Sequence, residues 1–175
     1  NVNNEDIKLT IADINEIKIE DIPEFDILLG GFPCQPFSIA GHRKGFNDEG
    51  RGDLFFRIAE ILKKRKPKAF LLENVKNLKG HDKGRTFKII SDTLKELGYH
   101  FKTQILNGMN YGNVPQNRER IFIVGFLDED KLNKFKFPEP IELTKSIRDM
   151  LEEDVSDEYY YNDKGVLEKS KSIKS

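Results

Sequence analysis

The sequence predicts an α/β fold in which an open, mainly parallel sheet carries helices on both faces. Short apolar runs at 25–29, 69–72 and 121–126 are bounded by glycine, proline or polar residues, as buried strands are. Longer segments between these runs repeat their apolar residues at helical spacing. Strands that alternate with helices favour a sheet whose crossover helices pack back on its faces.

The first half of the chain is expected to contain two strands and one helix. Residues 7–11 alternate apolar and polar side chains, which predicts a short strand before the one at 25–29. The glycine-rich, polar segment 41–52 is typical of a mobile loop. From residue 54 the apolar side chains fall on one helical face, and Pro67 ends this helix.

The second half repeats the alternation. The strand at 69–72 is followed by helical spacing over 87–97, and Gly98 suits the position just past a helix. Strands are expected at 101–106 and 121–126, with a glycine-containing loop between them.

The loop at 30–38 contains Cys34, the only cysteine of the chain. A free cysteine is most often a small buried hydrophobe without chemistry. Here Pro33 and Pro36 fix two φ angles and remove two backbone donors, so the loop is unusually stiff. Ligands of open parallel sheets bind outside the carboxyl ends of the strands, and this loop follows a strand. Cys34 is therefore a candidate nucleophile.

Three motifs identify a family. Gly-Phe-Pro-Cys-Gln-Pro-Phe-Ser at 31–38 resembles the catalytic loop of the DNA cytosine-5 methyltransferases. Glu-Asn-Val at 73–75 and Gln-Asn-Arg-Glu-Arg at 116–120 agree with that family in order and spacing. The resemblance covers roughly 12–150 and is especially close to HhaI-like members. It implies an S-adenosylmethionine-dependent, Rossmann-like methyltransferase sheet that is incomplete in this chain, with its last strand antiparallel at or near an edge.

The resemblance implies four catalytic residues. Cys34 would add to C6 of a flipped cytosine, and Glu73 would contact the N3 and amino group of the base. Arg120 and Arg118 would reach cytosine O2 and a nearby phosphate. The alternatives are a helix-capping or salt-bridged Glu73, and a structural ion pair of either arginine with Glu119 or another carboxylate. Asn74 is expected to brace the loops through hydrogen bonds.

The resemblance also implies a binding site for S-adenosylmethionine. Asp13 and Ile14 match the pair expected beside the adenine, and Pro33 and Leu54 match positions on the methionine side. The family's Phe-x-Gly-x-Gly loop has no counterpart in these residues, so the four form half of a pocket. We expect the other half, with the target-recognition domain, from a missing N-terminal segment or a second subunit.

The charge distribution predicts a nucleic-acid partner, which the resemblance narrows to double-stranded DNA. Residues 40–120 hold 18 basic and 9 acidic side chains, a net charge of +9. The flanking segments 1–39 and 121–175 have net charges of −6 and −4. A local basic surface matters more for phosphate binding than the total charge. The residues expected to contact DNA are Gln35, Ser38, Arg43, Lys44 and Arg51.

The remaining expectations follow from the length and composition of the chain. Residues 1–140 are expected to form a partial methyltransferase catalytic domain, and 141–175 a linker or the start of a target-recognition region whose end is flexible. No apolar run approaches a membrane span. One cysteine and no leader sequence predict a cytoplasmic, bacterial-type protein. Three scattered histidines and one cysteine predict no metal site.

The sequence therefore predicts a DNA cytosine-5 methyltransferase of the restriction-modification type, with this chain alone inactive. Two alternatives stay open. A related branch methylates tRNA by the same chemistry. The chain could also be a truncated, non-catalytic module that binds DNA or a partner subunit, which the missing cofactor loop motivates.

Overall fold

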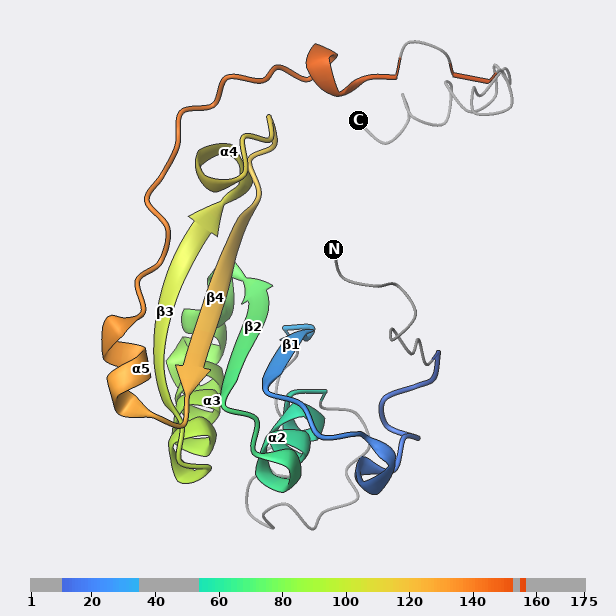
Figure 1. Cartoon of the computed structure of the whole chain (residues 1–175). Helices are drawn as coiled ribbons and strands as arrows, with labels where there is room; N and C mark the ends of the chain where they lie inside the picture. Colours follow the sequence, from blue (N-terminus) through green and yellow to red (C-terminus); the bar gives the residue numbers. More distant parts are fainter. Residues whose placement is uncertain (1–10, 35–53, 153–154, 157–175) are drawn as a thin grey trace.

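A four-stranded sheet is the centre of the fold in the computed structural model, which describes residues 11–34, 54–152 and 155–156 (Figure 1). The strand order is β1-β2-β4-β3. Their bounds are Ile27–Gly31 for β1, Ala69–Val75 for β2, His100–Asn107 for β3 and Glu119–Phe126 for β4. β1 pairs with β2 in parallel, and β4 is antiparallel to both β2 and β3.

The topology confirms most of the expected sheet. β1, β2 and β3 all run in one direction, and the last strand is antiparallel as expected. β4 lies between β2 and β3, one strand from the edge that β3 forms, which agrees with its expected place at or near an edge. Its central place agrees with its burial, because Ile121 and Ile123 are fully buried. The strand expected at 7–11 falls largely outside the described residues.

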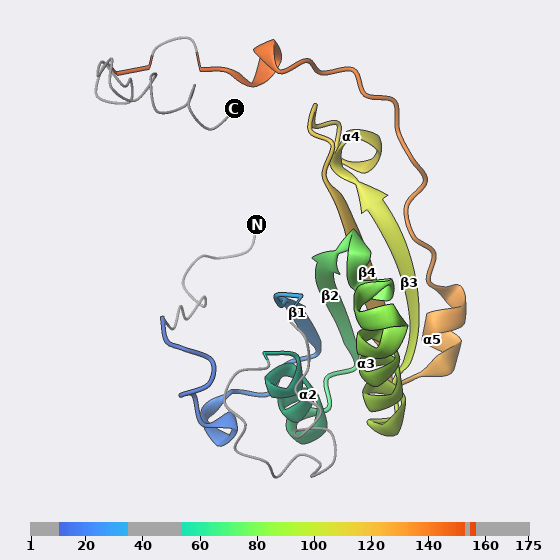
Figure 2. The ribbon, with the colours of Figure 1, turned by 180° about the vertical axis from the view of Figure 1, so that it is seen from behind.

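Two helices cover one face of the sheet (Figures 1 and 2). α2 spans Leu54–Arg65 and ends before Pro67, as predicted. α3 spans Arg85–Glu96, and Gly98 follows it with a φ of 87°, which glycine adopts without strain. None of the helices in the described part of the chain has the length and apolar character needed to cross a membrane.

Several short elements were not predicted, because their sequences are too short and polar to show periodicity. They are the helices α4 (Gly108–Tyr111) and α5 (Glu129–Lys134) and the 3₁₀ turns η2 (Ile19–Asp21), η4 (Lys76–Lys79), η5 (His81–Gly84) and η6 (Arg148–Met150).

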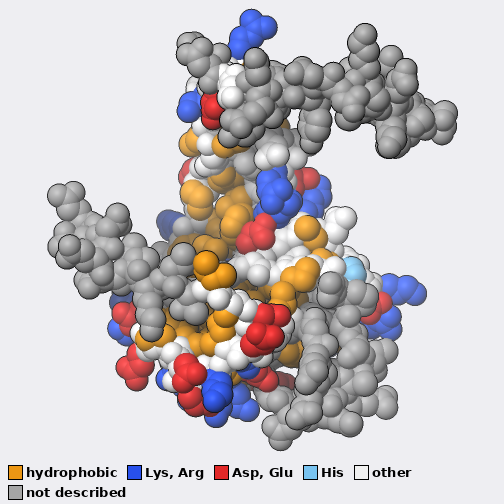
Figure 3. Space-filling view, turned by 90° about the vertical axis from the view of Figure 1, so that its right-hand side faces the viewer, with side chains coloured by type: hydrophobic (Ala, Val, Ile, Leu, Met, Phe, Trp, Pro, Cys, Tyr) orange, Lys and Arg blue, Asp and Glu red, His pale blue; other side chains and the backbone are white. Residues whose placement is uncertain are grey.

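The second face of the sheet is covered at β3 and β4 and open at β1. Lys102 of β3 donates from Nζ to the carbonyl of Leu132 in α5 at 2.8 Å. At the β1 end, Ile27 is 59% and Leu29 73% exposed. Figure 3 views the molecule from the β1 side and shows hydrophobic side chains at its surface. Helices thus lie on both faces as expected, but in the described residues the second face is only partly covered.

The core lies between the sheet and the two long helices. Tyr99 fixes one end of it, because its buried hydroxyl donates to the carbonyl of Pro67 at 2.8 Å. Its ring packs against the ring of Phe70, with the centroids 5.2 Å apart. The other large side chains that are fully buried here are Phe55, Leu62, Leu72, Leu78, Ile90 and Leu94.

Residues after α5 run as an extended segment along the sheet and past α4 (Figure 1). Ile141 N donates to the carbonyl of Asn110 at 2.6 Å, and Thr144 N donates to Oδ1 of Asn113 at 2.8 Å. The start of the segment 141–175 is therefore attached to the sheet's own loops. A domain boundary after residue 140 stays a prediction.

Gly125 in β4 leaves no room for a side chain. A Cβ at this position would lie 2.3 Å from Cζ and 2.4 Å from Cε1 of the buried Phe70 ring. We expect Gly125→Ala to lower the free energy of unfolding by about 1–3 kcal/mol, as overpacking of a core does. Urea unfolding followed by circular dichroism measures it.

The matched control is Gly30→Ala in β1. Its Cβ would meet side-chain atoms no closer than 3.6 Å, which is ordinary contact. Equal urea midpoints for the two variants would contradict the assigned packing of Phe70 against β4.

Candidate active site

Two predicted site segments meet at the edge of the sheet where β1 and β2 end. The strands are parallel neighbours, and Gly31 is the register partner of Glu73. A Cβ on Gly31 would lie 3.3 Å from Oε2 of Glu73, so glycine leaves space for the carboxyl group. Cys34 follows β1 directly after this point. The expectation that the two motifs share one edge is confirmed.

Arg120 joins this edge from the neighbouring antiparallel strand. Its Nε lies 2.8 Å from Oε1 of Glu73, and the two side chains are 24% and 34% exposed. Its Nη1 also donates to the carbonyl of Glu119 at 2.9 Å. The guanidinium is thus held in a fixed direction between the Glu73 carboxyl and the backbone of β4. A partly buried pair of this kind orients both groups more firmly than an exposed one.

Asn74 braces the ends of β1 and β2, as predicted. Its side chain is 1% exposed. Nδ2 donates to the carbonyl of Phe32 at 2.8 Å, and Oδ1 accepts from the backbone N–H of Val75 at 2.7 Å. Phe32 is itself buried, and its ring centroid lies 5.4 Å from that of Phe55. The backbone that leads into Cys34 is therefore anchored both by a buried hydrogen bond and by packing.

The Cys34 thiol is partly buried against the hydrophobic core. Burial raises the pKa of Cys34 above its ordinary value, because the thiolate loses solvation there. The thiol is consequently the resting form at neutral pH. A nucleophilic role would require removal of its proton when a substrate is bound.

Arg118 does not join the Glu73–Arg120 pair. Its side chain is exposed and forms no salt bridge with any residue that the structure describes. Its backbone is fixed instead by Asn107, whose Oδ1 accepts from the Arg118 N–H at 3.1 Å and from the Met109 N–H at 3.2 Å. Asn107 was not predicted, although an asparagine at a strand end is a typical turn and cap residue.

The four predicted cofactor residues lie on segments that α2 connects. Arg57 of α2 donates from Nε to the carbonyl of Ile14 at 3.0 Å, which places 13–14 beside the helix that Leu54 begins. Asp13 is exposed, and its Oδ1 accepts from the backbone N–H of Asn15 at 2.9 Å. Sequence reasoning missed Arg57, since one arginine on an amphipathic helix gives no signal of its partner.

Arg65 holds the same N-terminal segment further along. Its Nη2 donates to the carbonyls of Ile19 at 2.6 Å and Glu20 at 2.7 Å. Residues 14–20 are therefore attached to α2 at two points. Pro33, the other residue expected beside the methionine end, is exposed next to Cys34.

Some predicted residues cannot be compared with the structure. Gln35, Ser38, Arg43, Lys44 and Arg51, and the loop expected at 41–52, lie outside the described residues. Within the described ranges no group of His, Cys, Asp and Glu side chains could hold a metal ion.

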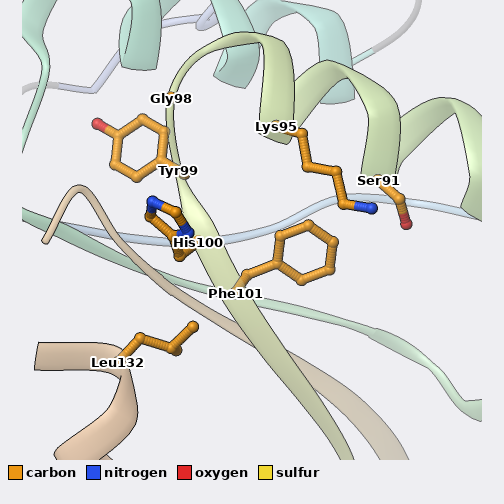
Figure 4. A pocket seen from close by; sticks show the side chains of 7 residues that line it. All are labelled: Ser91, Lys95, Gly98, Tyr99, His100, Phe101 and Leu132. Carbon is orange, nitrogen blue, oxygen red and sulfur yellow. The ribbon is translucent and has the colours of Figure 1, made fainter. Parts of the chain in front are cut away.

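A cavity of about 650 Å³ lies at the opposite end of the strands, where β3 begins (Figure 4). It is lined by side chains of α3, by the start of β3, and by Leu132 of α5. Since β3 starts there and ends at Asn107, the cavity is separate from the edge that holds Glu73 and Arg120.

Comparison with known sequences points to one family. A family described as C-5 cytosine-specific DNA methylase matches residues 1–175. The chain is 53% identical over 158 residues to the type II methyltransferase M.Bsp6I of Bacillus sp., covering 89% of this chain and 50% of that protein. It is 54% identical over 164 residues to M.HaeII of Haemophilus aegyptius, covering 93% and 50%.

A third relative is M.HhaI of Haemophilus parahaemolyticus, which is 44% identical over 156 residues and matched over 47% of its length. The chain thus spans about half the length of the curated relatives it matches.

Solved structures agree on the fold. The chain superposes on the S. pombe Dnmt2 methyltransferase with a TM-score of 0.60 at 23% identity, covering 93% of this chain and 52% of that one. The Entamoeba histolytica methyltransferase EhMeth gives a TM-score of 0.56 at 22% identity, with 87% and 48% covered. The α/β sheet is therefore a methyltransferase sheet.

The raised pKa of Cys34 can be measured directly, because the chain has no other cysteine. We expect the rate of alkylation by iodoacetamide to rise at higher pH in the folded protein than in the same protein unfolded in urea. Only the thiolate reacts, and burial makes it scarcer at a given pH. Mass spectrometry at timed intervals measures the rate. The burial of Cys34 would be contradicted if the alkylation rate of the folded protein rose at the same pH as that of the unfolded protein, or at a lower pH.

Proposed function

The chain belongs to the C-5 cytosine-specific DNA methylase family, and from this membership we propose that it supplies the nucleophile half of a DNA (cytosine-5) methyltransferase of a restriction-modification system. One structural observation supports this proposal most strongly. Glu73, which pairs with Arg120 of β4 at 2.8 Å, lies on β2, the strand beside the one that leads into Cys34. The partners lie on separate strands, as groups that converge on one substrate do.

In the proposed reaction, Cys34 acts on a cytosine that has left the base stack. The Sγ atom bonds to C6 after losing its proton, and the electron pair of the C5–C6 double bond makes C5 nucleophilic. S-adenosylmethionine, when bound, would supply the electrophilic methyl group to C5, with its methyl–sulfur bond broken and S-adenosylhomocysteine as the leaving group. Loss of the C5 proton then restores the double bond and releases the Cys34 thiolate.

Glu73 and Arg120 would bind and polarise the base. One carboxyl oxygen of Glu73 is held by Arg120, and the other lies beside Gly31 at the open side of the edge. A carboxyl group in this place can accept from the amino group of cytosine and, when protonated, donate to N3 and draw electrons from C6. The remaining N–H groups of Arg120 can donate to cytosine O2. Arg118, which is exposed, is proposed to reach a phosphate.

Four residues would form one wall of the cofactor site. Asp13 and Ile14 would lie beside the adenine, and Pro33 and Leu54 beside the methionine end. The attachment of Ile14 to α2 through Arg57 supports this grouping, because Leu54 begins the same helix. One exposed carboxylate and three apolar side chains suit a ligand that has both polar groups and apolar rings.

Further protein is proposed to complete this site. The chain spans about half the length of its relatives. β1 pairs with β2 alone among the described strands, and Ile27 and Leu29 are exposed beside its free edge. Unpaired edges and apolar patches of this kind bind another strand or another chain. We propose that a preceding segment or a second subunit covers β1 and supplies the remaining cofactor loop and the target-recognition domain.

Double-stranded DNA is the proposed macromolecular substrate, and Gln35, Ser38, Arg43, Lys44 and Arg51 are the proposed contacts from the loop after Cys34. The type II methyltransferases among the relatives support DNA over tRNA. Their bacterial sources support a cytoplasmic location. Assays with duplex DNA and with tRNA separate the two substrates, and methyl transfer to tRNA alone would overturn the choice of DNA.

Replacing the nucleophile gives the most direct test. In the complete enzyme, Cys34→Ser should abolish methyl transfer, because an alkoxide is far scarcer than a thiolate at neutral pH. Binding of duplex DNA should be retained. A duplex with 5-fluorocytosine at the target should trap the wild-type protein covalently, since fluorine cannot leave C5 as a proton does. Methyl transfer by the serine variant at a near-normal rate would remove Cys34 from the mechanism.

The need for further protein is tested by complementation. We expect residues 1–175 alone to show no turnover, because only one wall of the cofactor site is proposed to lie on them. Adding the rest of a relative's catalytic domain and its recognition domain, fused or in trans, should restore labelling of duplex DNA from S-adenosylmethionine. Sustained turnover by residues 1–175 without addition would contradict this division.

A further inference from the structure

The turn between β2 and α3, residues 76–85, carries a group of cations that the proposed chemistry does not use. It contains five basic side chains, counting His81, and one acidic side chain. The turn follows Val75 directly and leads into the first residue of α3 (Figures 1 and 2). Because Val75 is the register partner of Arg120, the turn begins at the same edge of the sheet as the proposed active site.

The backbone of this turn is strained. Asp82, Lys83 and Gly84 have φ values of 51°, 57° and 85°, so three successive residues adopt the left-handed conformation. Only the last of them is a glycine, which adopts this conformation without cost. Strain of this kind persists where the surrounding structure imposes it, and it is concentrated at functional sites.

The surroundings do hold the turn in place. Leu78 is fully buried beneath it. Nζ of Lys76 lies 2.5 Å from Oε2 of Glu119 in β4, and Nδ1 of His81 lies 2.7 Å from Oγ1 of the buried Thr86. The turn is therefore connected to the sheet at one end and to α3 at the other.

Two of its cations are not used in these connections. Lys76 is paired with Glu119, and Arg85 is paired with Asp82. Lys79 and Lys83 are exposed and form no salt bridge with any residue in the described ranges. The Lys79 ammonium lies 5.6 Å from the centroid of the Phe87 ring, an attraction that restricts its side chain.

We propose that Lys79 and Lys83 bind backbone phosphates of DNA beside the edge that holds Glu73 and Arg120. This inference rests on the proposed function and adds to it a surface outside the loop that follows Cys34. A backbone held in one conformation presents the two lysine side chains without further ordering of the turn. Phosphate contacts set the register of a protein on a duplex and carry no sequence information, so this surface would bind a duplex of any sequence.

The salt dependence of DNA binding tests this surface. The complete enzyme and its Lys79→Gln/Lys83→Gln variant are titrated with a labelled duplex of mixed sequence, between about 50 and 200 mM salt, and followed by fluorescence anisotropy. The slope of log Kd against log salt concentration should become shallower by about 2 in the variant, which is about 1 for each phosphate that the protein no longer neutralises.

The matched control removes the same charge from the far edge of the sheet. Lys64→Gln/Lys66→Gln changes two exposed lysines at the end of α2, just before β2 begins. Its slope should stay that of the wild type. An unchanged slope in the Lys79/Lys83 variant, or an equal change in both variants, would overturn the proposal, the second because net charge alone would then explain the effect.

A second variant separates charge from folding. Lys83→Gly removes the cation and relieves the strain at a φ of 57°. The urea midpoint should be unchanged or higher, while the salt slope becomes shallower by about 1. A lower midpoint with an unchanged slope would show that Lys83 serves the fold alone.

Different results would contradict the proposed function and the proposed phosphate-binding surface. If the wild-type complete enzyme neither binds nor methylates duplex DNA, the proposed function itself is wrong. If it methylates DNA and the Lys79→Gln/Lys83→Gln variant keeps the wild-type salt slope, only the phosphate surface is wrong.

Discussion

The active edge depends on one topological constraint, which is that β4 runs antiparallel beside β2. Glu73 comes near the end of its strand, whereas Arg120 comes near the start of its own. If all strands were parallel, these two positions would lie at opposite ends of the strands. Because β4 is reversed, Val75 pairs with Arg120 and the Glu73 carboxyl meets the guanidinium at 2.8 Å. The Gln-Asn-Arg-Glu-Arg motif at the start of β4 thereby lies beside the motifs at the ends of β1 and β2.

The second constraint is the buried carboxamide of Asn74, which joins this edge to the backbone that leads into Cys34, the proposed nucleophile. Its two hydrogen bonds to backbone groups of Phe32 and Val75 contribute about 1 kcal/mol each, and leaving a buried group unpaired costs about 1–3 kcal/mol. A free-energy penalty of this size favours the conformation in which both hydrogen bonds are formed, and it therefore holds the end of β1 in one position. The asparagine of the Glu-Asn-Val motif therefore positions Cys34, while its neighbour Glu73 faces the opposite side of the sheet.

The strands, the two long helices and the shared edge of Cys34 and Glu73 could be predicted because periodicity, proline and glycine signals are local. The two strands that flank β4 could not be predicted, since an apolar run indicates burial and not which strands lie beside it. The contacts of Arg57 and Asn107 were equally invisible, because their partners are backbone atoms distant in sequence. The strained turn at 82–84 was missed for another reason. Two of its three residues are not glycine, so composition gives no sign of the left-handed backbone.

The resting state of this edge follows from the same contacts. Burial keeps the Cys34 thiol protonated by raising its pKa, and the Glu73 carboxyl and the Arg120 guanidinium are bound to each other. Each group is thus occupied before a base arrives. A flipped cytosine offers O2 as an acceptor for Arg120 and its amino group as a donor to Glu73, while N3 can accept a proton from Glu73 only when that carboxyl group is protonated. In the proposed reaction the base therefore enters the ion pair rather than an empty site, and the nucleophile is activated only after the base is in place.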